Sequence, residues 1–334
     1  MAKPPACPPT LPRWSGRVGS WTLAARALLG PPMSRPSFWV TPLPSPPPCE
    51  PLPIVNTHSS SIGLRPSSSP LQLLRSLWHH RFLLRQLVRR DVASRYRGSL
   101  MGLLWSLLLP CVMLAVYVFV FGYVFTPVRK VGDGALSPAF ALSLFAGMLL
   151  HGMLGECLSR APAAVLAQPS YVKKVVFPME LLPLAVVGTA VVQFLIGSAV
   201  LLLALVLTQG LPATAWLWPL AWLPLVALVA GIALMLAALT VYLRDLAQLT
   251  GFVATLLLFL SPVFYPLESL PPNWQHWLLL NPLTVPIEAT RSLLVHGQGL
   301  NWAHWSAHAA GCLATLWAGW WIFQRARKGF ADVI

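Results

Sequence analysis

Arginine side chains gather where a basic segment passes without a break into an apolar one. In "LVRRDVASRYRGSLMGLLWSLLLP", residues 87–110, the apolar run is preceded by Arg89, Arg90, Arg95 and Arg97. Cations beside an apolar segment determine on which side of a membrane that end stays, and they attract anionic lipid head groups. The spacing therefore points to binding chemistry at a membrane surface.

Two histidines have the spacing of a zinc motif, but the rest of the motif is missing. His304 and His308 are separated as in H-E-x-x-H, whereas Trp305 stands where that motif has its glutamate base, and no third ligand is evident. The five cysteines are scattered with no C-x-x-C pair, so they indicate neither a disulfide framework nor a zinc site. We therefore expect no metal site, no catalytic residue and no cofactor in this chain.

The composition indicates what kind of protein positions these arginines. Of 334 residues, 56% are hydrophobic and only 10% are charged, and the mean hydropathy is +0.67. A water-soluble domain of this size cannot bury so much apolar surface, so the chain is predicted to be an integral membrane protein. The net charge of +14 would suggest nucleic acid in a soluble protein, but here the cations flank apolar runs. Membrane lipids, not nucleic acid, are the expected partners.

Residues 1–70 differ in composition from the rest of the chain. They contain 17 of the 33 prolines and much of the serine, without periodicity, and such a composition cannot bury enough apolar surface to fold. We predict a disordered extension that is dispensable for membrane insertion. A start codon chosen too far upstream is an equally open explanation, because the foldable part begins only near Leu71.

The segment 71–97 has the pattern of a surface helix. Leucine and valine recur at spacings of three, four and seven, while arginines occupy the other faces. No soluble domain remains for such a helix to pack against. It is therefore predicted to lie on the membrane as one amphipathic interfacial helix.

Six apolar stretches follow, each long enough to cross the membrane, since about 20 apolar residues span ~30 Å of hydrocarbon. They lie near residues 103–125, 138–158, 180–207, 216–241, 247–265 and 305–323. The predicted fold class is thus all-α integral membrane, with six transmembrane helices. With a cytoplasmic amino terminus, fourteen Lys and Arg residues fall inside and three fall outside, namely Arg129, Lys130 and Arg291. This asymmetry predicts that both termini are cytoplasmic.

Two connections differ from ordinary loops. Residues 162–177, between the second and third spans, contain a short helix candidate on the cytoplasmic side that is suited to dock into another protein. The stretch 261–301 is long and apolar, yet its prolines prevent one continuous spanning helix, so it is predicted to form short re-entrant or interfacial helices. Within it, Glu288 and Arg291 either form an ordinary pair on a helix surface or shape the external exit.

Few ionisable residues lie deep in the predicted spans. Glu156 is near the cytoplasmic end of the second span, and Glu180 is near the start of the third. Because an unpaired carboxylate is unfavourable beside hydrocarbon, both are expected to pair with Arg160 or Lys174.

Six segments together resemble the signature segments of the membrane subunit of polysaccharide-exporting ABC transporters. They occur in the expected order: "RRDVASRYRGSLMGLLWSLLLP", "YVKKVVFPMELLPLA", "VYLRDLAQL", "LSPVFYPLESLP", "NPLTVPIEATR" and "RKGFADVI". Several segments in one order are far more specific than any single one. Residues 71–334 are therefore identified as the transmembrane domain of an exporter of O-antigen, capsule or teichoic acid, whereas residues 1–70 match nothing in the pattern.

The resemblance implies a homodimer that works with two copies of a separate ATPase in the cytoplasmic (inner) membrane. The chain lacks the G-x-x-x-x-G-K-[ST] loop that binds ATP phosphates, so the partner must supply it. The resemblance also implies that residues 162–177 are the coupling helix that contacts the ATPase and that residues 71–97 are a gate helix at the cytoplasmic entrance. The expected ATPase-coupling residues are Val165, Leu166, Tyr171, Lys173 and Lys174.

The substrate implied by the resemblance is a glycan on a polyprenyl diphosphate, whose phosphates sit at the membrane surface. The planar guanidinium of arginine holds phosphate through two hydrogen bonds, which gives the basic segment a role besides topology. Both roles stay open for Arg89 and Arg90, and phosphate binding is favoured for Arg95 and Arg97.

A passage for sugar should present aromatic faces and few fixed charges. Tyr117, Phe121 and Phe125 fall on one face of the first span, and Phe259 and Tyr265 lie at the end of the fifth. Stacking on sugar rings is one interpretation of these five aromatics. Packing between helices or contact with lipid is the other.

Two other functions are alternatives. An ABC permease for a drug or a small lipid would share the six spans, although the ordered segments favour polysaccharide. A membrane-embedded glycosyl or acyl transferase would need convergent acids, histidines or a metal site, which the sequence does not indicate.

Overall fold

The structure, a computed structural model, consists of helices joined by turns and loops in the part of the chain that it describes. It describes residues 70–99, 101–102, 104–121, 138–168 and 177–330. All of them belong to the second of the two compact units of the chain, residues 62–334. Within these ranges no residue forms a β-strand, in agreement with the predicted all-α class.

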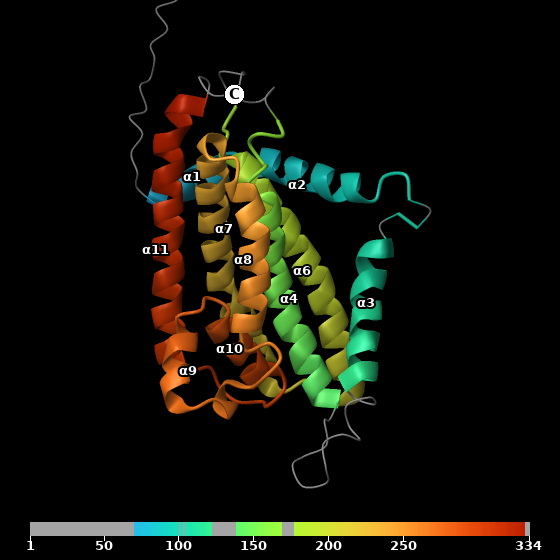
Figure 1. The fold of residues 1–334 in the computed structure, drawn as a ribbon. Helices are drawn as coiled ribbons and strands as arrows, with labels where there is room; N and C mark the ends of the chain where they lie inside the picture. Colours follow the sequence, from blue (N-terminus) through green and yellow to red (C-terminus); the bar gives the residue numbers. More distant parts are fainter. Residues whose placement is uncertain (1–69, 100, 103, 122–137, 169–176, 331–334) are drawn as a thin grey trace, which may run out of the picture. The chain divides into compact units, whose positions relative to one another are not determined.

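The helices are named as in Figure 1. The α-helices are α1 (Pro70–His79), α2 (Arg81–Arg95), α3 (Leu104–Phe119), α4 (Pro138–Arg160), α6 (Leu181–Thr208), α7 (Trp218–Tyr242), α8 (Leu246–Leu260), α9 (Pro272–Leu279), α10 (Thr284–Leu294) and α11 (Trp302–Ala326). The short 3-10 helices are η3 (Ala213–Leu217), η4 (Leu267–Ser269) and η5 (Arg327–Gly329).

Each of the six predicted spans coincides with a helix. In the described part, three helices are long and apolar enough to cross a membrane: Ala139–Arg160, Leu181–Thr208 and Ala213–Tyr242. The helices α3 and α8 are apolar but shorter, and α11, which packs against α7, is 25 residues long. A helix of that length extends about 37 Å, enough to cross the hydrocarbon. Three helices are therefore candidate spans by length and composition, and the count of six stays a prediction.

The fifth predicted span ends earlier than expected. It was predicted to reach residue 265, whereas α8 ends at Leu260 and Ser261 is extended, with φ −91° and ψ 149°. Pro262 explains the end, because the residue before a proline is disfavoured in the α conformation.

The single amphipathic helix predicted over residues 71–97 is wrong: the chain bends at His80, which has φ −100° and ψ 16°. On one side of the bend, α1 buries Leu73 in the main core. On the other side, α2 buries Leu87 against Leu181 and Ala185 of α6. One straight helix could not reach both places. As a result, α2 lies across the ends of the long helices, as Figure 1 shows.

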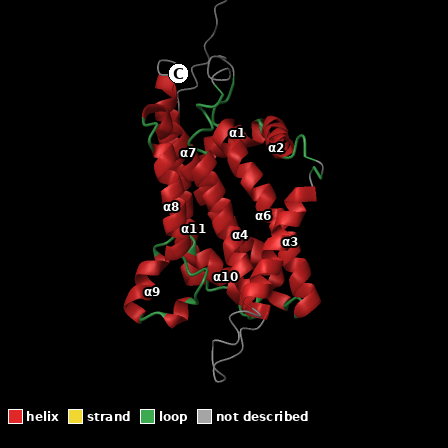
Figure 2. Ribbon diagram, turned by 45° about the vertical axis from the view of Figure 1, so that its right-hand side comes forward, coloured by secondary structure: helices red, strands yellow, loops and turns green. Residues whose placement is uncertain are grey.

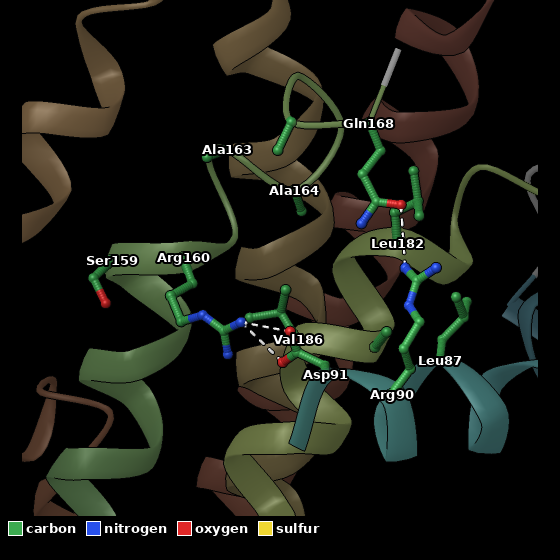
Figure 3. A pocket seen from close by; sticks show the side chains of 12 residues that line it. Leu87, Arg90, Asp91, Ser159, Arg160, Ala163, Ala164, Gln168, Leu182 and Val186 are labelled. Carbon is green, nitrogen blue, oxygen red and sulfur yellow. Dashed lines mark hydrogen bonds and ion pairs between the residues drawn. The ribbon is translucent and has the colours of Figure 1, made fainter. Parts of the chain in front are cut away.

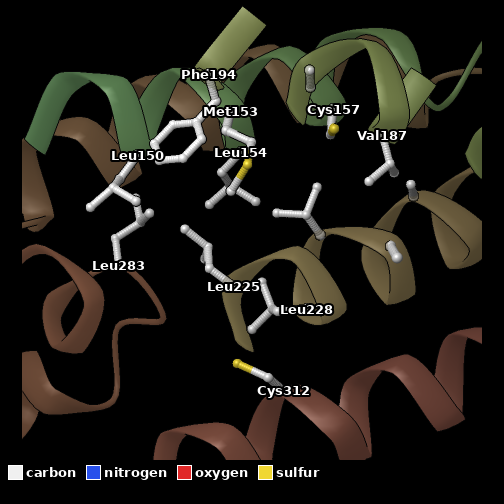
Figure 4. Close-up of a cluster of buried hydrophobic side chains, with 14 of the residues drawn as sticks. Leu150, Met153, Leu154, Cys157, Val187, Phe194, Leu225, Leu228, Leu283 and Cys312 are labelled. Carbon is white, nitrogen blue, oxygen red and sulfur yellow. The ribbon is translucent and has the colours of Figure 1, made fainter. Parts of the chain in front are cut away.

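The core lies between α4, α6, α7 and α11. Leu150 of α4, Phe194 of α6 and Leu225 of α7 converge in it, and Cys312 of α11 closes one side (Figure 4). The ring of Phe194 lies 5.1 Å from that of Trp222, measured between centroids.

The helices α7 and α11 approach each other through glycines. A Cβ atom on Gly319 would lie 2.1 Å from the carbonyl oxygen of Gly231, and one on Gly231 would lie 2.5 Å from that of Thr315. Since real Cβ atoms do not come so close to backbone, only glycine permits this distance between the two helix axes.

The predicted short helices between the fifth and sixth spans are present as α9 and α10. They lie at the end of the bundle opposite α2, as Figures 1 and 2 show. Leu283, Ile287 and Leu293 of this region are buried, so α10 is part of the core. Whether these helices re-enter the membrane stays a prediction.

Candidate functional site

A groove of about 360 Å³ lies where α2 crosses the bundle (Figure 3). Its walls are α2, the last turn of α4, the turns at 161–168 and the first turns of α6. Val88 of α2 packs over Gly188 of α6, where a Cβ atom would meet a valine methyl carbon at 2.5 Å. Through this close contact, α2 packs directly against α6 beside the groove.

An ion-pair network joins α2 to the end of α4. Arg160 donates from Nη2 to both carboxylate oxygens of Asp91, each at 2.8 Å, and from Nη1 to Oε1 of Glu156 at 3.1 Å. Arg95 also pairs with Glu156, and its Nη2 lies 3.9 Å from Asp91. The predicted pairing of Glu156 with Arg160 is confirmed. The four side chains carry two positive and two negative charges, so the network is neutral.

The network is partly screened from water. Its four side chains are between 17% and 35% exposed. Burial lowers the pKa of the Arg95 guanidinium, and the nearby charge of Arg160 adds to this, whereas Asp91 opposes it. Each of the two carboxylates lies within 4 Å of both arginines, so every charge in this partly buried cluster has an opposite charge beside it.

The four arginines expected at the substrate entrance all lie on α2 or just after it. Arg89 is exposed, and Arg90 donates to the side-chain amide oxygen of Gln168 at 3.4 Å (Figure 3). Arg95 belongs to the network, and Arg97 is exposed in the turn that follows α2. The four therefore lie within one short segment, in which Arg90 and Arg95 both have partners within the chain.

The residues expected to couple to an ATPase fall into two groups. Val165 is fully buried and Leu166 packs against the core, so these two side chains anchor the segment to the bundle. Ala163 and Ala167 are the exposed side chains beside them. Residues 161–167 form successive turns, and residues 169–176 of the expected short helix lie outside the described residues. The remaining members of the group, Tyr171, Lys173 and Lys174, lie outside the described residues.

The aromatic residues predicted to line a channel also fall into two groups. Tyr117 and Phe121 pack toward α4, with ring centroids 6.3 Å from Phe145 and 5.9 Å from Phe140 respectively. Phe259 is 65% exposed and stacks on Phe264 at 6.3 Å. Of the other two predicted aromatics, Tyr265 is partly buried and Phe125 lies outside the described residues.

A buried carboxylate has a partner that sequence spacing did not reveal. Glu180 is 5% exposed, and its Oε2 accepts from Nη1 of Arg327 at 3.3 Å, while its Oε1 accepts from Ser76 at 3.1 Å. The expected pairing with Arg160 is wrong, because Asp91 and Glu156 occupy that guanidinium. The other candidate, Lys174, lies outside the described residues.

At the opposite end, Glu288 and Arg291 form a pair that is not on an open helix surface. Arg291 is 7% exposed and donates to Glu288 at 2.7 Å and to the carbonyl of Pro262 at 3.1 Å. Glu288 also accepts from the backbone amide of Leu267. The pair therefore fastens the loop after α8 to α10. Burial raises the pKa of the Glu288 carboxyl, and Arg291 opposes this shift.

Comparison with known proteins identifies the family to which this chain is similar. The family model described as ABC-2 type transporter matches residues 83–295. The chain is 30% identical to the O-antigen export system permease protein RfbA of Myxococcus xanthus over 272 residues, which are 79% of this chain and 100% of that protein. It is 26% identical to RfbA of Klebsiella pneumoniae over 75% of this chain and 95% of that protein. It is 24% identical to the polysialic acid transport protein KpsM of Escherichia coli, over 70% and 90% respectively.

Proposed function

Since the chain belongs to the ABC-2 type transporter family, we propose that it is the membrane subunit of an exporter that moves a lipid-linked polysaccharide across the cytoplasmic membrane. The observation that carries this proposal is the full-length alignment with an O-antigen export permease. A relative named for polysialic acid transport supports the same class of cargo. The six helices that coincide with the predicted spans would form the transmembrane domain, with both termini in the cytoplasm.

The working unit is a homodimer with two copies of a separate ATPase. The absence of a P-loop from the sequence supports a partner that binds ATP. On α3 and α8, large apolar side chains such as Val112, Phe252 and Leu256 are exposed and require lipid or a second copy to cover them. A passage between the two copies would present the stacked rings of Phe259 and Phe264 to sugar.

The ATPase would press on the turns at 161–168. The exposed side chains of Ala163 and Ala167 form the contact, while the buried Val165 transmits force into the bundle. Because Arg160 comes directly before these turns and binds Asp91, a displacement there would also move α2. This connection makes α2 a gate that responds to ATP hydrolysis.

The diphosphate of the substrate would bind at the end of α2. Arg97 is exposed just past the network, and Arg89 is exposed on the helix itself. A guanidinium in this position meets phosphate at the membrane surface with two parallel hydrogen bonds. We assign the first contact to Arg97, because Arg95 is engaged with Glu156.

Lysine in place of Arg97 is expected to impair export without changing topology. The charge is kept, but the bidentate contact is lost, and one such contact is worth about 1.5 to 3 kcal/mol, roughly a tenfold change or more. Surface polysaccharide would be measured per amount of membrane-inserted protein, with Arg85→Lys on the preceding helix α2 as control. Export by Arg97→Lys at the wild-type rate would leave this arginine with a topological role only.

Deletion of the chain tests the proposed function itself. Surface polysaccharide should disappear, and lipid-linked polymer should accumulate in the cytoplasmic leaflet, because synthesis continues while export stops. Re-expression of this chain should restore export only in cells that keep a partner ATPase. A permease for a drug or a small lipid predicts the contrary result, unchanged surface polysaccharide in the deletion strain.

A further inference from the structure

A second cavity, of about 290 Å³, lies at the end of the bundle opposite α2. It is enclosed by η4, α9, α10, the loop at 298–301 and the first turn of α11. The network and the groove described above have no residue in it. If α2 faces the cytoplasm, as proposed, this cavity faces the outside, where an exported polymer leaves the protein.

The lining combines polar and apolar side chains. Glu288 and Ser292 come from α10, Asn301 and His304 from the start of α11, and Glu268 from η4. These side chains supply carboxylate, hydroxyl, amide and imidazole groups, so the cavity offers both donors and acceptors of hydrogen bonds. The large apolar side chains of the lining are Leu267, Leu279 and Leu300.

The elements around the cavity hold it open. The Arg291 guanidinium lies behind Glu288 and binds the carbonyl of Pro262, and Glu288 accepts from the amide of Leu267. Asn301 caps α11 by accepting from the backbone amide of His304 at 3.3 Å. The walls are therefore fixed to one another by hydrogen bonds before any ligand arrives, which lowers the entropy that binding must overcome.

These features match the chemistry of a sugar ring. A pyranose presents hydroxyl groups around its edge and apolar C–H groups on its faces, and the cavity offers both polar partners and leucine side chains. Its volume is at the lower end of the range of small-molecule sites, about 300 to 1,000 Å³, and suits a single sugar unit.

The charge of the lining restricts which sugar can enter. Glu268 and Glu288 contribute two carboxylates, whereas Arg291 compensates only one of them. Glu268 lines the cavity and is exposed, so an incoming group can reach it from the solvent. A sugar that itself carries a carboxylate would be repelled, and an ammonium group would be attracted.

We propose that this cavity is a carbohydrate subsite that accepts a neutral or amino-bearing sugar unit and rejects one that carries a carboxylate. The inference rests on the proposed function and deepens it, because it names the class of glycan. The cargo would then differ in charge from polysialic acid, the cargo named for one relative.

The test uses the full chain, purified and placed in lipid nanodiscs, with three tetrasaccharide probes. Maltotetraose is neutral, the chitosan tetramer carries amino groups, and tetrasialic acid carries carboxylates. Binding is measured by saturation-transfer NMR and calorimetry. The neutral and amino probes should bind, and tetrasialic acid should not. Binding of none of the three, or of all three equally, would overturn the proposal.

Glu268→Lys separates this site from binding elsewhere. The substitution should weaken binding of the amino probe by about tenfold, which corresponds to one lost hydrogen bond to a charged group. It should also allow tetrasialic acid to bind. Asp245→Lys is the matched control, since this exposed aspartate lies between α7 and α8 outside the cavity. Equal effects of the two substitutions would contradict the assignment. These binding experiments do not measure export. If they fail while the deletion strain loses its surface polysaccharide, the subsite is refuted and the proposed function is not.

Discussion

Leucine at position 319 is expected to remove folded protein from the membrane almost completely. A Cβ atom there would lie 2.1 Å from the carbonyl oxygen of Gly231 and 2.9 Å from its Cα, so α7 and α11 would have to separate along their shared surface. Overpacking of an ordinary core costs about 1 to 3 kcal/mol. The cost should be larger here, because the clash is with backbone, which no side-chain rotation relieves.

The measurement is the amount of monodisperse protein extracted from membranes, determined by fluorescence-detected size-exclusion chromatography. Gly311→Leu on the same helix is the control, since a Cβ atom at Gly311 meets nothing within 4 Å. The Gly311 variant should accumulate normally, whereas the Gly319 variant should fall by more than about tenfold, a change that corresponds to 1.4 kcal/mol. Equal accumulation of the two variants would mean that α7 and α11 do not pack as described.

Reversal of the charge at Asp91 should stop export while the chain still inserts. Asp91→Arg places a third positive charge beside Arg95 and Arg160, leaving Glu156 as the single acid of the network. Because the four side chains are partly exposed, the effect on the free energy of unfolding should be small. The main effect should be that α2 is no longer held against the end of α4, so that a movement of α4 is no longer transmitted to α2.

A second reversal should restore the connection. In the double variant Asp91→Arg and Arg160→Glu, opposite charges again face each other across the groove, and export should recover most of the way from a loss of about tenfold or more. Arg85→Glu changes the charge of α2 outside the network and serves as control for topology. If the double variant exports no better than Asp91→Arg alone, the network does not carry the coupling.

The helices could be predicted from the sequence because each depends on a local pattern. The apolar runs that became α4, α6 and α7 are long, and hydropathy alone locates them. The bend at His80 was missed, since residues on both sides continue one amphipathic pattern. The reason for the bend lies elsewhere in the fold, in the separate places where Leu73 and Leu87 are buried.

The site was only partly predictable for the same reason. Arg160 and Glu156 are one helical turn apart, so their pairing follows from spacing. The pairs of Glu180 with Arg327 and of Arg95 with Glu156 join different helices, and they depend on how each helix is rotated about its axis. For the same reason the spacing of Glu288 and Arg291 left two alternatives open, and only the structure shows that the loop after α8 covers the pair.

The pairing of Glu180 with Arg327 has a consequence for how the protein is made. The two residues are 147 positions apart, and every helix from α6 to α11 is synthesised between them. Until the ribosome has synthesised the last helix, the Glu180 carboxylate cannot pair with the Arg327 guanidinium. Helix α1 binds the same carboxylate through Ser76, so its position also depends on this late pairing. The first described helix and the last described turn are thus joined in one late step, and a nascent chain that stops before residue 327 lacks the ion pair that joins them.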